Sequence, residues 1–203
     1  VISPMTSGEF STLNGGIKIS YDSASVYTPL IFNIEHQRNN HSTIYSLTPT
    51  NILLHGGIKV SLPLITQDQK TGIYFRLNGG WVFQNSTVDS NTNALSAILT
   101  RTLGDISLLS DENPPSFGRI KVSVPKGYLN ISFRYYDNLS GVDTDEIKMY
   151  IDDVPIIPEI DGEHHRAFYN GDTPIVKGKH QLRISIKDKV KNSNEYARSF
   201  VVK

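Results

Sequence analysis

The chain has 203 residues, with 20 basic and 20 acidic side chains that cancel to a formal net charge of zero, and it has no cysteine. Balanced charge without a basic stripe argues against nucleic acid or an anionic membrane surface as a partner, and no segment approaches the roughly 20 consecutive apolar residues that span a bilayer. The absence of cysteine excludes disulfides, thiolate nucleophiles and cysteine-ligated zinc.

Segments that alternate apolar and polar residues run along the whole chain and predict half-buried strands, with glycine-containing turns between them. The first half is expected to hold strands near residues 8–20, 29–36, 43–47, 58–66, 72–77, 81–85, 95–99 and 105–109. The second half is expected to hold strands near residues 118–124, 129–136, 146–151, 154–159, 165–169, 181–188 and 195–202. The chain is therefore predicted to be all-β.

Two consecutive prolines, Pro114 and Pro115, mark the expected domain boundary. They remove adjacent backbone donors and so bar a central strand from continuing through this point. We expect an N-terminal β-sandwich domain over residues 1–113 and a second β-sandwich domain over residues 114–203. Seven strands in the second domain match the count of an immunoglobulin-like sandwich.

The second domain resembles bacterial immunoglobulin-like repeats over residues 116–203. Those repeats carry a D-x-x-S-G-V-D turn, an "I-D-G" type hairpin and a late G-x-H-x-L-x-I-x-x-x-D strand. The turn corresponds here to residues 137–143, the hairpin to residues 151–153 and the late strand to residues 178–188. The D-x-x-G-N pattern that usually follows departs at one position, because Lys191 stands where glycine is expected.

The first domain carries two further resemblances. Residues 70–74, Trp81 and residues 103–115 are similar to a stretch that precedes such repeats in bacterial surface proteins, and residues 23–30 resemble an element of ZU5-like sandwich domains. The same tandem is similar to the non-catalytic region that follows the catalytic domain of some exported lysostaphin-like, peptidoglycan-cleaving zinc peptidases. The resemblance implies that the chain is an accessory part of such a protein.

No recognisable catalytic motif lies in the chain, so we expect the fragment itself not to be an enzyme. The zinc peptidases need an H-x-x-x-D pair and an H-x-H, and the histidines offer neither spacing. No G-x-S-x-G elbow occurs either. Because Val1 opens the chain without methionine or a signal sequence, we expect the chain to be cut from a longer precursor.

Two groups of side chains are candidate metal ligands, although no bound metal or other cofactor is expected. His164 and His165 stand among acidic residues, but neighbouring strand residues point to opposite faces, so a polar hairpin edge is the preferred interpretation. Asp137 and Asp143 lie in an oxygen-rich loop that is the candidate calcium site. Here we favour side-chain turns, in which Asp137 and Ser140 bond the backbone, because no D-x-D-x-D-G spacing is present.

Three aromatic residues are the candidate ligand contacts: Trp81, Tyr74 and Tyr136. Flat aromatic faces can stack on the apolar faces of sugar rings. The preferred interpretation of Trp81 is nevertheless a core anchor, because a lone tryptophan on a sandwich strand commonly fills that place. Of the pair Tyr135 and Tyr136, one ring is expected to point inward and the other outward.

These observations predict a non-catalytic accessory region of a larger exported bacterial cell-envelope protein, serving as a spacer, a substrate-positioning element or an adhesion surface. The expected location is extracellular or periplasmic, and the expected partners are cell-wall glycan, another polysaccharide or a second envelope protein. The alternative is a polysaccharide-binding module, favoured by an exposed Trp81 or Tyr136. A third alternative is an enzyme whose site lies in an interdomain cleft.

Overall fold

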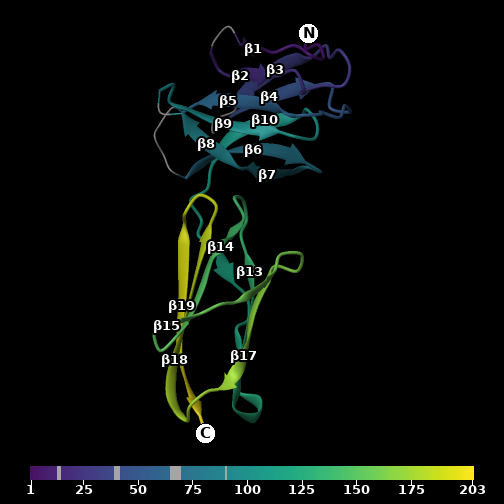
Figure 1. Cartoon of the computed structure of the whole chain (residues 1–203). Coiled ribbons are helices and arrows are strands. Elements are labelled where there is room, and N and C mark those ends of the chain that lie inside the picture. The colour runs from purple at the N-terminus through teal and green to yellow at the C-terminus, as the bar shows by residue number, and fades with distance from the viewer. Residues whose placement is uncertain (13–14, 39–41, 65–69, 90) are drawn as a thin grey trace. The chain divides into compact units, whose positions relative to one another are not determined.

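The computed structural model describes residues 1–12, 15–38, 42–64, 70–89 and 91–203, and nearly all its regular structure is antiparallel strand (Figure 1). The described chain forms two compact units, Val1–Asp111 and Glu112–Lys203. The division falls two residues before the boundary expected from the prolines. The all-β prediction is confirmed.

The first unit pairs two antiparallel five-stranded sheets. The first sheet runs in the order β1 (Gly8–Ser11), β2 (Lys18–Tyr21), β5 (Ile58–Pro63), β9 (Ala94–Leu99) and β8 (Ser86–Asp89). The second sheet runs in the order β3 (Asn33–Arg38), β4 (Thr43–Thr48), β10 (Asp105–Ser110), β6 (Thr71–Leu77) and β7 (Gly80–Gln84). We call these the β5 sheet and the β10 sheet.

The period-two pattern explains the core of the first unit. On β5, Ile58, Val60 and Leu62 are at most 1 % exposed, whereas the intervening Lys59 points to solvent. Side chains from both sheets join one apolar cluster, because alternate residues of each strand face the other sheet. Burial of this cluster removes apolar area from water, which supplies the main favourable term in folding.

The second unit is built in the same way from two further antiparallel sheets. The first sheet contains β11 (Ser116–Phe117), β13 (Tyr128–Tyr136), β17 (Arg166–Pro174) and β16 (Glu159–Asp161), with β12 (Lys121–Ser123) also paired to β13. The other sheet runs in the order β15 (Val154–Ile156), β14 (Val142–Ile151), β18 (Gly178–Asp188) and β19 (Ser193–Val202). A short 3₁₀ turn, η1 (Pro125–Gly127), precedes β13.

The core of the second unit comes mainly from the long strands β13 and β18. Ile131, Phe133 and Tyr135 alternate inward on β13, and Ile184 and Ile186 do so on β18. Tyr136 is 47 % exposed, whereas Tyr135 is 1 % exposed, so the prediction of one ring inward and one outward is confirmed.

Several predicted elements differ in the structure. The strand expected near residues 8–20 is a hairpin, β1 and β2, because Gly15 turns the chain with a φ of 63°. The strand expected near residues 154–159 is two short strands, β15 and β16. The strand expected near residues 165–169 continues through Gly171 to Pro174 as β17, opposite an irregularity in β13, where a Cβ on Gly171 would stand 3.2 Å from the Leu129 carbonyl oxygen.

The hairpin between β14 and β15 turns through two aspartates rather than through glycine. Asp152 and Asp153 have φ values of 49° and 63°, a left-handed region that aspartate tolerates better than most residues. The Asp152 carboxylate accepts the N–H of Gln181 at 2.8 Å and lies 2.6 Å from Nδ1 of His180. The carboxylate therefore ties the turn to the start of β18.

His180 is held between two acceptors. Its side chain is 13 % exposed, Nδ1 faces Asp152, and Nε2 lies 2.8 Å from the Val176 carbonyl oxygen. The imidazolium form donates from both nitrogens, so these hydrogen bonds raise the pKa of His180 above its ordinary 6.5. The bonds from Gln181 and His180 lower the pKa of Asp152 from 3.8.

The stability contributed by this contact is expected to depend on pH. Because folding raises the pKa of His180, the contribution should be complete below pH 6.5 and lost as pH rises through the raised value. At the acid end it should be lost as pH falls below 3.8 through the lowered pKa of Asp152. Urea unfolding of the wild type and of His180→Gln at about pH 5.5 and about pH 9 measures the free energy of unfolding that His180 contributes at each pH, which should be larger at pH 5.5. A stability difference equal at both pH values contradicts the assignment.

Candidate functional site

The outer face of the β10 sheet carries a row of polar and aromatic side chains that crosses all five strands. Glu35 on β3 pairs with Ser46 on β4, and Ser46 pairs with Asp105 on β10. Arg76 on β6 then pairs with Trp81 on β7. We call these five residues the Trp81 row.

Direct contacts order the middle of the Trp81 row. The Ser46 hydroxyl donates to Oδ1 of Asp105 at 2.7 Å, and Nη1 of Arg76 lies 3.7 Å from Oδ2 of the same carboxylate. The Arg76 guanidinium carbon stands 5.8 Å from the centre of the Trp81 ring, within the range of a cation–π contact. Arg76 is thus held between a carboxylate and an indole.

The structure gives Trp81 a different place from the core position that we favoured. Its side chain is half-buried and is not part of the apolar cluster between the sheets. Phe75 and Ile73 on β6 fill that cluster instead, while Tyr74 and Arg76 point to the opposite face. The core interpretation of Trp81 is therefore wrong, because its register on β7 places it opposite the outward-facing Arg76.

Tyr74 shares the outer face but is not accessible to a ligand. It is 0 % exposed and packs edge-to-face against Phe83, with ring centres 5.5 Å apart. Gly72 makes room for this pair, since a Cβ there would lie 2.5 Å from the Phe83 ring. Its burial excludes Tyr74 as a ligand contact. The third candidate, Tyr136, is exposed and lies in the second unit.

The chemistry of the Trp81 row suits a ligand with both apolar and hydroxylated faces. An indole offers a flat apolar surface, and the guanidinium and carboxylate beside it offer fixed donors and acceptors. Arg76, Asp105 and Ser46 were not expected from the sequence to be part of a site. The spacing of two residues from Tyr74 to Arg76 could have placed Arg76 on this face, but the cross-strand neighbours depend on the pairing of strands far apart in sequence.

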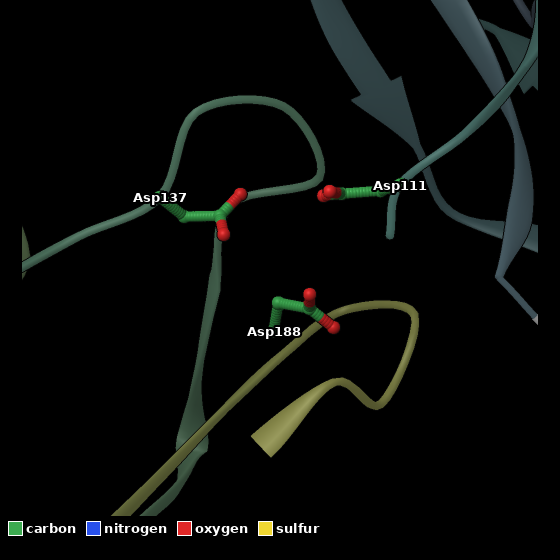
Figure 2. A group of neighbouring side chains, drawn as sticks. All are labelled: Asp111, Asp137 and Asp188. Carbon is green, nitrogen blue, oxygen red and sulfur yellow. The ribbon is translucent and has the colours of Figure 1, made fainter. Parts of the chain in front are cut away.

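The second unit has a compact polar group where two of its turns meet. Asp137 follows β13, and Asp188 ends β18; their carboxylates include oxygens within 4.8 Å of each other (Figure 2). Oδ2 of Asp137 accepts the N–H groups of Leu139 at 3.1 Å and Gly141 at 2.7 Å. This is the side-chain turn that we favoured for Asp137 from sequence, and Gly141 supports it with a φ of 82°.

Asp188 organises the other turn in a similar way. Its side chain is fully buried, and Oδ1 accepts the N–H groups of Val190 at 3.0 Å and Asn192 at 2.8 Å. Oδ2 accepts Nδ2 of Asn192 at 2.7 Å. Lys191, at the position where the repeat pattern has glycine, adopts a φ of 73°. Lysine therefore occupies a left-handed backbone position that glycine would adopt without strain.

Asp143 does not join this carboxylate pair. It accepts a hydrogen bond from Nζ of Lys191 at 2.9 Å, and this bond raises the pKa of the lysine.

Asp137 Oδ1 is buried and has no hydrogen-bond partner within the described part of the chain. Asp137 and Asp188 could supply carboxylate oxygens to a hard cation such as calcium, but two residues are a minor part of the six to eight oxygens that calcium takes.

Asp111 is also drawn in Figure 2 and ends the first unit. It is fully buried, and its backbone N–H donates to the Lys70 carbonyl oxygen at 3.0 Å. This bond ties the end of the first unit to the residue that precedes β6.

The two adjacent histidines have separate structural partners. The backbone N–H of His164 donates to Asp161 at 3.1 Å, and its Nδ1 lies 2.9 Å from the same carboxylate. The ring of His165 packs edge-to-face on Tyr135, 5.9 Å between centres. Within the described ranges, neither belongs to a group of three closely spaced potential ligands.

No protein-family model matches the chain, and comparison with curated proteins finds no similar sequence. Across the described residues, no helix has the length and apolar character needed to cross a membrane.

Asp188→Ala is expected to lower the free energy of unfolding by about 2–4 kcal/mol, because it leaves three donors of the buried turn without their acceptor. Chemical denaturation of the full chain measures the loss. Asp188→Asn keeps one acceptor oxygen and should cost less. Asp172→Ala, on an exposed part of β17, is the matched control and should stay within about 0.5 kcal/mol. A loss below about 0.5 kcal/mol for Asp188→Ala would show that the carboxylate does not hold the turn.

Proposed function

We propose that this chain is a non-catalytic accessory region of a larger exported bacterial cell-envelope protein, and that it positions this protein on polysaccharide. The observation that carries the proposal is the Trp81 row. Trp81 lies on an outer sheet face, next to the Arg76–Asp105 pair, instead of filling the core. The resemblance of the chain to regions that accompany cell-wall peptidases supports cell-wall glycan as the substrate class.

The geometry supports sugar binding through two complementary contacts. The apolar face of a pyranose ring packs against an aromatic ring, while its equatorial hydroxyls need donors and acceptors at the edge of that ring. Arg76 supplies donors, and Asp105 supplies acceptors, next to Trp81. Because these groups contact one another, part of the entropic cost of ordering them is met before a ligand arrives.

A binding experiment can use Trp81 as its own reporter, because it is the only tryptophan in the chain. Purified peptidoglycan is expected to sediment the full chain, and soluble peptidoglycan fragments are expected to change the tryptophan fluorescence. Trp81→Ala should lower the affinity for peptidoglycan, measured by sedimentation, by about 30-fold. This factor corresponds to the loss of about 2 kcal/mol of binding free energy that truncation of an aromatic anchor causes. Trp81→Phe keeps a smaller ring, and its affinity should lie between those of the wild type and Trp81→Ala.

Tyr128→Ala is the matched control, since it removes an exposed aromatic residue that is not a candidate ligand contact from a strand of the second unit. It should bind as the wild type does, provided that circular dichroism shows both variants folded. Equal binding by Trp81→Ala and the wild type would reject the Trp81 row as the site. If the wild type does not sediment with peptidoglycan, the role of the chain as a polysaccharide-positioning region is rejected, and a spacer role is the better interpretation.

A further inference from the structure

The outer face of the β5 sheet carries a second polar row, on different strands from the Trp81 row. Ser11 on β1 pairs with Lys18 on β2, and Lys18 pairs with Ser61 on β5. Ser61 pairs with Ser96 on β9, and Ser96 pairs with Thr87 on β8. Four of these five side chains end in a hydroxyl, and we call the set the serine row.

Four members of the serine row, Ser11, Lys18, Ser61 and Ser96, line a groove of about 460 Å³. Ser96 and Ala94 point away from the core on β9, yet they are only 6 % and 8 % exposed. Longer side chains from neighbouring strands, including Lys18, Lys59 and Asp89, also line the groove. The two small residues therefore form its floor, which lies below the level of the surrounding sheet face.

The composition of this floor is unusual for a strand. Exposed sheet faces favour β-branched and aromatic residues, because these pack against their cross-strand neighbours. Here Ser61 and Ser96 face each other at the centre of the sheet and share one hydrogen bond of 2.8 Å between their hydroxyls. Such departures from local preference are expected where a function requires them. Small side chains keep the groove open, and their hydroxyls remain able to bond a ligand.

The charges around the groove compensate one another. Lys18 pairs with Glu9 at 2.6 Å. Asp89 accepts bonds from Thr92 and Asn91, which together with nearby Lys59 lower its pKa. With two lysines facing two carboxylates, the groove has no net charge to select an anion or a cation. An uncharged ligand with many donors and acceptors is the class that matches this lining.

We propose that the serine-row groove binds an uncharged glycan, with the sugar chain lying across the strands. A hydroxyl both donates and accepts, so a line of serines can bond successive sugar hydroxyls in either direction. Neighbouring strands are about 4.8 Å apart, a spacing close to the repeat of one pyranose in an extended β-linked chain. Each sugar would then lie over about one strand. This site does not depend on Trp81 and is separate from the site proposed above.

The test uses cellotetraose and chitotetraose, two uncharged β-linked tetrasaccharides, added to the ¹⁵N-labelled full chain at about 1 mM, where weak single-site binding is measurable. At least one of them is expected to shift the amide signals of residues 18, 61 and 96. The shifts should persist in Trp81→Ala, because the groove does not use that residue. Shifts confined to residues 76, 81 and 105 would support the Trp81 row and overturn this proposal.

An isosteric pair of variants separates the hydroxyl from the shape of the side chain. Ser96→Thr keeps the hydroxyl, whereas Ser96→Val replaces it with a methyl group of similar size, and both residues favour strands. The Val variant is expected to bind the tetrasaccharide at least about 10-fold more weakly than the Thr variant at equal thermal stability. Equal affinity of the two variants overturns the proposal, as does the absence of groove shifts with both sugars. If both position-96 variants unfold, Ser61→Thr and Ser61→Val give the same comparison on β5.

Discussion

The structure depends on one constraint: each strand must turn alternate side chains toward a partner sheet, because the chain has no disulfide to hold a loosely packed sandwich. Buried clusters such as Ile58, Val60 and Leu62 of β5 meet this requirement. The same alternation sends every second side chain outward. The two outer faces of the first unit are therefore direct consequences of how its core is filled, and they are free to carry different chemistry.

Those two faces differ in the size of their outward side chains. On the β10 sheet, Trp81 and Arg76 are large and contact each other above the sheet, so the face offers an aromatic surface. On the β5 sheet, Ser61 and Ser96 are small, so the face is hollow and lined with hydroxyls. Both arrangements suit sugars for different physical reasons, one through apolar stacking and the other through hydrogen bonding. A sandwich presents both at little cost, because outward positions contribute little to the core.

In the second unit, carboxylates stabilise turns that commonly rely on glycine. Asp152 and Lys191 have positive φ values. Hydrogen bonds to the Asp152 carboxylate hold the hairpin that contains Asp152, and hydrogen bonds to the Asp188 carboxylate hold the turn that contains Lys191. Backbone N–H groups donate to these carboxylates, which replaces hydrogen bonds that the turns would otherwise make with water. The turns are thus ordered at the cost of backbone strain. This explains how the turn closes with lysine at position 191.

The sequence alone determined the all-β class, the approximate strands, the region of the domain boundary and the role of Asp137 as a turn former, because period-two alternation and side-chain turns are local effects. It also predicted that Tyr135 points inward and Tyr136 outward. The tertiary structure decided that Trp81 faces outward next to Arg76, that Asp137 lies near Asp188, and that four hydroxyls line up across the β5 sheet. The row of hydroxyls depends on the pairing of strands tens of residues apart, such as β5 and β9, and the approach of Asp137 to Asp188 depends on how the turn after β13 meets the end of β18. The place of Trp81 depends on the register of the β6–β7 hairpin, because a shift of one residue there would turn its side chain to the other face.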